Sequence, residues 1–346
     1  MEKKVAAIDV GYGYTKYATG TSRKDIKCHH FLSQAPVASN LAMAEALGSA
    51  LRIVEIPING LKYAVGPDVS MATGAAPVRH MDNTYSESDE YLALVRGALN
   101  YMKVDKIDLL VGGLPVKVFE AKREALERRL TGTHAVGEGR TVVIKRAKIL
   151  AQPRGALLTY AIANNQLANI KTQTNLIPDP GSRTFDWVLT RGLKPFTERS
   201  GSVDKGMLDV IRVIAEGISR DERLEFGDYE RIDHALRTNT RPLIFGREYD
   251  LRKYLPAAKK ITQEAVTAMK RSVGEGAHID NIILGNGGAF FFKQAIQDGF
   301  PRHKVHDLRE GIYANVIGFL LAGIEVVLHE ARRPGEAPPT VLATGD

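Results

Sequence analysis

The chain has 346 residues, 44% of them hydrophobic and 25% charged, which is typical of a folded globular protein. Its length favours two lobes over a single core, and its lone cysteine, Cys28, excludes an internal disulfide and fits a reducing cytoplasm. The net charge is +7, but the basic residues are dispersed, which favours solvated faces over a nucleic-acid groove. No secretory signal and no uninterrupted apolar run of about 18 residues stands out. We therefore expect a cytoplasmic protein with no membrane partner and no direct nucleic-acid motif.

Hydrophobic periodicity and capping residues predict alternating strands and helices along the whole chain. An Asn59-Gly60 turn between apolar flanks adds a hairpin inside the Pro-, Gly- and Ala-rich segment 34–82. A short tail, 332–346, contains several prolines and is expected to be disordered or loosely docked. In chain order, the expected elements are strands at 4–10, 14–19 and 27–31, a hairpin at 56–63, a helix capped at 86–90 and ending near 102, a strand at 107–111, a helix at 119–130, a strand at 141–150, a helix at 153–169, a hairpin around 179–186, helices at 202–218, 229–236 and 251–273, a strand at 279–284 and a helix at 309–331.

Two acidic, glycine-containing hairpin signatures lie about half the chain apart. The first is Asp9-Val-Gly11-Tyr-Gly13-Tyr-Thr-Lys16, and the second is Asp179-Pro-Gly181-Ser-Arg183-Thr184-Phe-Asp186. Glycine lets a turn approach a ligand and aim its N–H groups at phosphate oxygens, and an aspartate that ends a strand can hold Mg²⁺ through its water shell. Two such turns facing each other would grip a nucleotide phosphate chain. Taken singly, each also fits an ordinary hairpin.

Two basic side chains belong to these turns. Lys16 can place a compact positive charge against a β- or γ-phosphate, although its turn joins two strands and is therefore not a P-loop. Arg183 lies at the tip of the second turn, where its guanidinium could pair with phosphate oxygens or point into water.

Two further motifs are candidates for the same chemistry. In Ile282-Ile-Leu284-Gly285-Asn286-Gly287-Gly288, a strand runs into a glycine cluster before a helix, which allows close approach to a base or phosphate. Its spacing is not that of a dinucleotide-binding G-x-G-x-x-G. Gln152, at the entry of the helix that contains Pro153, cannot act as a base, but its amide can orient an attacking water. Alone, Gln152 would also suit a simple hydrogen bond at a helix start.

The order of these motifs closely resembles the actin-like ATPase superfamily. Within it, the chain is most similar to the ParM/StbA plasmid-segregation group and especially to the plasmid-borne PRTRC system protein D family. The resemblance covers roughly residues 3–330. It is carried by Ile8-Asp9-Val-Gly11-Tyr-Gly13, Gly112-Gly113-Leu-Pro115-Val, Gln152-Pro153-Arg-Gly155-Ala, Asp179-Pro-Gly181-Ser-Arg-Thr184-Phe-Asp186-Trp187 and Tyr313-Ala-Asn315-Val-Ile-Gly318-Phe.

This resemblance implies ATP and Mg²⁺ as cofactors and a role for each motif. Tyr12 stands where the group usually has Ser or Thr, and Arg183 replaces a usual glycine. The implied assignments are Asp9 and Asp179 for the metal through water, Gly11, Tyr12, Gly13 and Lys16 for the β-phosphate side, Gly181, Ser182, Arg183 and Thr184 for the γ-phosphate side, Gly285, Gly287 and Gly288 for adenosine, and Gln152 for the hydrolytic water.

The implied fold is α/β, a duplicated, ribonuclease H-like actin fold with two lobes around a nucleotide cleft. We expect lobe I at 1–155 with the C-terminal helix 320–332, lobe II at 156–319 and a flexible tail at 333–346. Gly155 and the Gly311/Gly318 pair suit close helix packing, although they also suit ordinary helix irregularities.

The implied function is an ATPase that forms head-to-tail filaments with itself and turns them over by hydrolysis, in plasmid segregation with a DNA-binding adaptor. The alternatives are a sugar or metabolite kinase and a non-polymerising regulatory ATPase of the same fold. A kinase needs a carboxylate base at the acceptor hydroxyl, whereas the resemblance places Gln152 at this position, which favours water as the acceptor.

Overall fold

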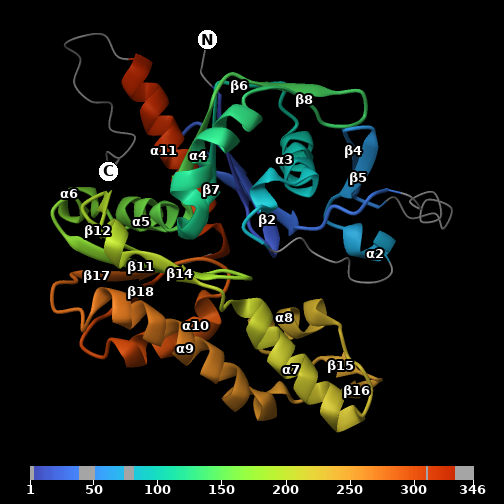
Figure 1. Cartoon of the computed structure of the whole chain (residues 1–346). Helices are drawn as coiled ribbons and strands as arrows, with labels where there is room; N and C mark the ends of the chain where they lie inside the picture. The colour runs from blue at the N-terminus through green and yellow to red at the C-terminus, as the bar shows by residue number, and fades with distance from the viewer. Residues whose placement is uncertain (1–3, 39–50, 74–81, 309–310, 332–346) are drawn as a thin grey trace. The chain divides into compact units, whose positions relative to one another are not determined.

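The computed structural model describes residues 4–38, 51–73, 82–308 and 311–331 (Figure 1). The chain divides into two compact units. The first comprises Met1–Ala168 and Tyr313–Asp346, and the second comprises Asn169–Ile312. The divisions thus fall after residues 168 and 312, compared with the 155 and 319 expected from the sequence. The expected tail at 333–346 lies outside the described residues.

A five-stranded sheet forms the centre of the first unit. The strands are β1 (Val5–Val10), β2 (Tyr14–Thr19), β3 (Lys27–Leu32), β7 (Leu109–Leu114) and β10 (Ala147–Ala151). Their order is β10-β7-β1-β2-β3. β10, β7 and β1 are parallel, whereas β1, β2 and β3 form an antiparallel meander.

Helices cover both faces of this sheet. They are α3 (Asp89–Met102), α4 (Val116–Leu130), α5 (Gln152–Ala163) and α11 (Ala314–Ala331). Successive residues of a strand point to opposite faces. Ala6 and Ile8 therefore join the core under α3 and α4, whereas Val5 and Ala7 pack against α11. Asp9 lies two residues after Ala7 on β1, so its side chain lies on the same face of the sheet as Val5 and Ala7, the face covered by α11.

Two glycines let α5 and α11 cross at close range. A Cβ at Gly318 would lie 2.0 Å from the Gly155 carbonyl oxygen, and one at Gly155 would lie 2.4 Å from the Asn315 carbonyl oxygen. The Asn315 side chain accepts a hydrogen bond from the Ala156 N–H at 3.1 Å. The expectation of close helix packing at Gly155 and Gly318 is confirmed.

Smaller elements complete the first unit. The Asn59-Gly60 turn has φ of 49° and 82°, both positive as a type I′ hairpin requires, so this prediction is confirmed. The elements are η1 (Arg23–Asp25), β4 (Val54–Ile58), β5 (Leu61–Val65), α2 (Val69–Thr73), η2 (Tyr85–Glu87), β6 (Lys106–Ile107), β8 (Gly132–Ala135) and β9 (Thr141–Ile144). At the two connections between units lie α6 (Leu167–Ile170) and η5 (Gly311–Tyr313).

The second unit is built on a six-stranded sheet. Its strands are β11 (Thr174–Pro180), β12 (Phe185–Arg191), β13 (Lys194–Pro195), β14 (Gly201–Val203), β17 (Asn281–Leu284) and β18 (Val305–Asp307). The order is β13-β12-β11-β17-β18, with β14 also paired to β12. β11, β17 and β18 are parallel, whereas β12 is antiparallel to β11.

Helices and a small hairpin complete this unit. Phe185 of the sheet stacks on Phe292 with ring centroids 5.3 Å apart, inside one continuous core. The elements are η3 (Thr197–Arg199), α7 (Met207–Glu222), α8 (Tyr229–Thr238), β15 (Leu243–Ile244), β16 (Arg247–Glu248), η4 (Leu251–Tyr254), α9 (Leu255–Val273) and α10 (Ala289–Gly299).

The two large sheets have the same design. Each begins with an antiparallel meander, β1–β2–β3 or β11–β12–β13, and two parallel strands extend it from the first strand of that meander. In both, the hairpin signature joins the first two strands. The predicted α/β duplication is confirmed at the level of strand order.

Several element predictions were wrong in detail. Residues 141–150 form two strands in different sheets, β9 and β10, because the pair Lys145-Arg146 interrupts the apolar run. The predicted helix at 202–218 starts later, at Met207, because β14 pairs with β12. The helix that contains Pro153 stops at Ala163, and Asn165 adopts a left-handed φ of 55°.

One helical stretch is long and apolar enough to cross a membrane by composition alone, and it runs from Gly311 to Ala331. Within the part of the chain that the structure describes, its packing identifies it as a core helix instead. Phe319 and Leu320 of α11 are fully buried against β1 and β7.

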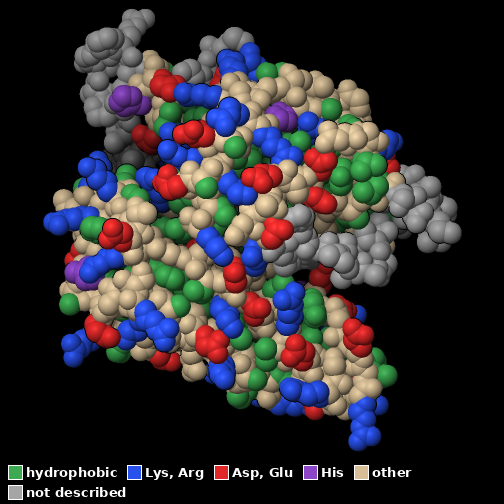
Figure 2. All heavy atoms as spheres, in the orientation of Figure 1, with side chains coloured by type: hydrophobic (Ala, Val, Ile, Leu, Met, Phe, Trp, Pro, Cys, Tyr) green, Lys and Arg blue, Asp and Glu red, His purple; other side chains and the backbone are tan. Residues whose placement is uncertain are grey.

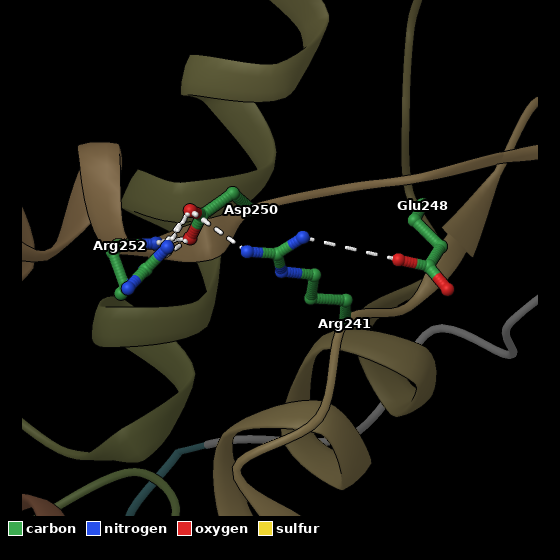
Figure 3. Close-up of polar contacts among 4 residues, drawn as sticks. All are labelled: Arg241, Glu248, Asp250 and Arg252. Carbon is green, nitrogen blue, oxygen red and sulfur yellow. Dashed lines mark hydrogen bonds and ion pairs between the residues drawn. The ribbon is translucent and has the colours of Figure 1, made fainter.

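The charged surface is mixed in sign. On the face drawn in Figure 2, basic and acidic side chains are interspersed. Beside β15 and β16, Arg241 lies 3.9 Å from both Glu248 and Asp250, and Asp250 also pairs with Arg252 (Figure 3). Such exposed pairs contribute little stability. This pattern supports dispersed, solvated charge.

Candidate functional site

The candidate site of the first unit is the tip of the β1–β2 hairpin. The turn is closed by a hydrogen bond from the Gly11 N–H to the Tyr14 carbonyl at 3.1 Å. A Cβ at Gly11 would lie 3.2 Å from that same oxygen, so a larger residue would crowd the turn. The Gly13 carbonyl accepts a hydrogen bond from the Ser33 N–H at 2.9 Å. The tip is therefore compact and attached to the end of β3.

Asp9, Lys16 and Gln152 meet at the base of this hairpin. Antiparallel pairing places Asp9 opposite Lys16. The Lys16 ammonium lies 3.0 Å from Asp9 Oδ2, and the Gln152 amide donates to Asp9 Oδ1 at 2.7 Å. All three side chains are buried, and Asp9 is only 1% exposed. Asp9 therefore has a partner on each carboxylate oxygen.

The sheet explains why Gln152 reaches Asp9. β1, β7 and β10 are parallel, so their carboxyl ends lie at one edge of the sheet, where ligands of α/β proteins bind. Gln152 is the first residue of α5 and directly follows β10. A Cβ at Gly113 of β7 would lie 3.0 Å from Gln152 Cγ and 2.5 Å from the Phe319 ring, so this glycine makes room for both.

Tyr12 has contacts of its own at the hairpin tip. Its hydroxyl donates to the Asp82 carbonyl at 3.0 Å, and its ring stacks on Tyr85 with centroids 4.9 Å apart. The hydroxyl therefore bonds to backbone within the first unit, and what the tip offers a ligand is its N–H groups.

The β11–β12 hairpin is the corresponding candidate site in the second unit. The Gly181 N–H donates to the Thr184 carbonyl at 2.8 Å, which repeats the bond between Gly11 and Tyr14. The first turn of α7 fixes the tip, because the N–H groups of Met207 and Leu208 donate to the carbonyls of Gly181 (3.0 Å) and Ser182 (2.8 Å). A side chain at Gly206 would meet the Ser182 oxygen at 2.4 Å.

Two buried aspartates face each other in this hairpin. Asp179 pairs with Asp186 across the strands, and both are 2% exposed. The Thr184 hydroxyl donates to Asp186 Oδ2 at 2.6 Å. The second hairpin thus places a carboxylate where the first has Lys16.

The guanidinium of Arg183 lies beside an acidic residue of its own unit. Its Nη2 is 3.4 Å from Asp204 Oδ1, and its side chain is 18% exposed. Arg183 therefore forms an ion pair within the second unit, an arrangement that neither sequence-based alternative, phosphate contact or exposure to water, had included.

A third element, the turn Gly285–Gly288, is joined to the second hairpin. The Gly288 N–H donates to the Pro180 carbonyl at 3.0 Å, and a Cβ at Gly288 would lie 2.6 Å from that oxygen. Asn286 takes a left-handed φ of 71°. Gly285 is buried at the end of β17. Gly288 therefore lies next to Pro180 in the Asp179 hairpin.

Arg237 on α8 holds this turn from the other side. It donates to the Gly287 carbonyl at 2.6 Å and to Asp233 Oδ2 at 2.8 Å, and it lies over the half-exposed Phe290 ring at 5.2 Å. Sequence analysis missed Asp233 and Arg237, because an Asp–Arg pair four residues apart is an ordinary helix feature. It also gave no role to Asp186, although the Asp179–Asp186 spacing equals that of Asp9 and Lys16.

Each unit thus brings its own predicted residues together. Asp9, Gly11, Lys16 and Gln152 meet in the first unit. In the second, the hairpin from Asp179 to Thr184 lies beside Gly288.

The residues suit a magnesium ion that is bound mainly by water and phosphate. Asp9 and Asp179 are buried carboxylates at strand ends, the hard oxygen ligands that Mg²⁺ prefers. Within the described residues, no group of three or more His, Cys, Asp or Glu side chains forms a closed metal cage. Mg²⁺ usually keeps several waters and takes phosphate oxygens. Each aspartate by itself therefore fits Mg²⁺ that arrives with a nucleotide and keeps most of its waters.

Two family models match the two halves of the chain. Residues 7–155 match the N-terminal domain of actin-like proteins, and residues 177–298 match the C-terminal domain of the archaeal MreB-like actin homologues. The chain is an actin-like protein. No curated protein sequence is a significant match to it.

Solved structures of actin homologues share the fold. The archaeal actin homologue Ta0583 superposes with a TM-score of 0.74 at 19% identity, over 92% of this chain and 98% of that one. ParM from Clostridium botulinum, solved as a 15-stranded filament, gives 0.74 at 21% identity over 93% and 99%. AlfA from the B. subtilis plasmid pLS32, also solved as a filament, gives 0.62 at 16% over 92% and 98%. The actin-like protein therefore has the two-domain α/β fold of this superfamily.

Proposed function

We propose that this actin-like protein binds Mg-ATP, polymerises into filaments and hydrolyses the ATP to turn the filaments over. One observation carries the proposal. Two sheets share the same order of five strands, and in each the first two strands are joined by a glycine hairpin with a buried aspartate at its base. A structure of Ta0583 in complex with ADP supports a nucleotide as the ligand.

The proposed nucleotide contacts follow the geometry of each unit. In the first unit, Gly11 closes the turn, the backbone from Tyr12 to Gly13 supplies N–H groups, and Lys16 supplies a positive charge on the β-phosphate side. In the second unit, the tip from Gly181 to Thr184 serves the γ-phosphate. The turn Gly285–Gly288, held by Arg237, receives the adenosine. Mg²⁺, when bound, neutralises phosphate charge, and Asp9 and Asp179 would hold it through its waters.

Gln152 is the residue that we assign to the attacking water. Its amide can donate and accept hydrogen bonds at once, which orients a water without removing its proton. Asp9 fixes this amide at 2.7 Å, and the packing of Gly113 leaves room for it. A kinase would need a carboxylate base here, so the glutamine favours hydrolysis over transfer to a sugar.

Filament formation is supported by the relatives, because ParM and AlfA were both solved as filaments. Identical subunits that add head to tail make an open, heterologous assembly. We further propose plasmid segregation with a DNA-binding adaptor as the setting, in the cytoplasm. Membership of the PRTRC system protein D family stays a prediction.

Changing Gln152 to alanine tests the chemical step. Gln152→Ala should slow phosphate release roughly 100-fold, the scale on which a group acting on the attacking nucleophile contributes, and should leave nucleotide affinity nearly unchanged. Gln294→Ala, which removes an exposed glutamine on α10, is the matched control. Turnover that is equal in both variants would remove Gln152 from the mechanism.

Sedimentation tests the assembly step. With Mg-ATP the wild-type protein should pellet above a critical concentration, and Gln152→Ala should give filaments that persist longer. Phosphate release without any pelleting would favour the non-polymerising regulatory ATPase. Dependence of turnover on an added sugar would favour the kinase.

A further inference from the structure

Tyr12 connects the first hairpin tip to a distant segment of the same unit. It lies between the two tip glycines, and its hydroxyl donates to the Asp82 carbonyl at 3.0 Å. Its ring stacks on Tyr85 at 4.9 Å with an interplanar angle of 23°. Seventy residues separate Tyr12 from Asp82 along the chain. One side chain thus makes both a polar and an aromatic contact with segment 82–88.

The aromatic contact continues into the core. Tyr85 meets Tyr91 edge to face, with centroids 5.5 Å apart and planes at 86°. Tyr91 is 3% exposed on the first turns of α3, and burial, together with the neighbouring Tyr85, raises the pKa of its hydroxyl. Tyr12, Tyr85 and Tyr91 therefore form a continuous column of rings, which we call the tyrosine column.

Segment 82–88 is also braced from α4. Arg129 donates to the carbonyls of Ser86 at 3.0 Å and Ser88 at 2.9 Å. Ser88 in turn caps α3 by accepting from the Tyr91 N–H at 3.1 Å. Segment 82–88 is therefore attached to α3 and α4 on one side and to Tyr12 on the other. A displacement of the hairpin tip would strain the contacts of this segment.

We propose that Tyr12 is a positioning residue that couples nucleotide occupancy of the first hairpin to segment 82–88. The tip N–H groups must turn toward a phosphate, and the Tyr12 ring moves with their backbone. Because the ring is stacked on Tyr85, a shift of the tip changes the packing of 82–88. This inference rests on the proposed nucleotide site and adds a residue and a responding segment to it.

Hydrogen–deuterium exchange on the full chain tests the coupling. The probes are Mg-ADP and a non-hydrolysable Mg-ATP analogue, and the readout is the protection of amides in 82–88. Wild type and Tyr12→Phe, which keeps the ring, should gain protection when nucleotide binds. Tyr12→Leu and Tyr85→Leu should lose that gain and weaken binding about three- to ten-fold, the scale of one aromatic pair. Tyr14→Phe, at the same turn but outside the column, is the matched control.

The outcomes separate this inference from the proposed function. If wild type binds no nucleotide, both are contradicted. If wild type binds but Tyr12→Leu keeps the full gain of protection, the coupling alone is contradicted. The double variant Tyr12→Leu/Tyr85→Leu should bind no more weakly than the single variants, because both substitutions remove the same stacked pair. If the losses of binding free energy of the two single variants add in the double variant, the coupling is also contradicted. Thermal melting of each variant checks that the fold is intact.

Discussion

The two hairpins have the same backbone and opposite side-chain chemistry. In both, an aspartate lies at the base, and the N–H of the glycine two residues later closes the turn by donating to the carbonyl three residues further on. The residue seven positions after the aspartate faces it across the strands. In the first unit that residue is Lys16, and in the second it is Asp186. The first hairpin therefore carries its own counter-ion, whereas the second sets two carboxylates side by side.

The same hairpin backbone thus carries a balanced charge pair in the first unit and two neighbouring carboxylates in the second. Like charges directly opposite each other in a sheet destabilise it, and a cation relieves that repulsion. Asp9 is already balanced by the Lys16 ammonium and the Gln152 amide. We infer that the second hairpin gains more from the arrival of Mg²⁺ than the first.

The largest expected effect comes from exchanging the residue opposite each aspartate. Lys16→Met leaves Asp9 buried without its ammonium, which should cost about 3–5 kcal/mol of unfolding free energy. Asp186→Asn removes a repulsion and keeps an acceptor for Thr184, so it should cost less than about 1 kcal/mol or stabilise the protein. Urea unfolding of the nucleotide-free protein measures both.

Two features sharpen this experiment. Trp187, the sole tryptophan, lies on β12, so its fluorescence reports the second unit while circular dichroism reports both units. Lys24→Met, at an exposed position, controls for the loss of a surface lysine. If Lys16→Met were as stable as Lys24→Met, the idea that the first hairpin is internally balanced would be wrong.

Acid should lower the stability of the two units unequally. This effect should be smaller than that of Lys16→Met. His134 in the first unit is 3% exposed, and burial lowers its pKa. Its Nε2 lies 3.0 Å from the Leu130 carbonyl, and among the described residues no group bonds to Nδ1, so a second proton there would be unsatisfied. In the second unit, burial and then Lys304 lower the pKa of His306, which is only partly buried.

The sign of the pH effect follows from proton binding. The unfolded chain takes up protons near the ordinary histidine pKa of about 6.5, before the folded histidines do. Stability is therefore fully present above that pH and is lost as the pH falls below it. His134→Gln should reduce the loss between pH 7.5 and 5.5 more than His306→Gln does, in urea titrations at each pH. Equal loss in both variants would contradict this difference between the units.

The sequence predicted the hairpins well because the relevant signals are local. Alternating apolar residues and turn glycines fix β1, β2, β11 and β12, and the Asn59-Gly60 turn specifies its own geometry. The partners that complete the site depend on tertiary structure. Arg237 reaches Gly287 across fifty residues. The Tyr12–Asp82 bond likewise has no signal in either local sequence. The division of 141–150 between two sheets was missed although the pair Lys145-Arg146 marks it in the local sequence.

Calorimetric titration with Mg-ATP measures most directly whether the two hairpins serve a single nucleotide. We expect one nucleotide per chain, binding that depends on Mg²⁺, and a loss of affinity of about 10- to 100-fold in each of Asp9→Asn and Asp179→Asn, as found when groups that support a metal are replaced. Wild-type affinity in either variant, or binding indifferent to Mg²⁺, would contradict the account.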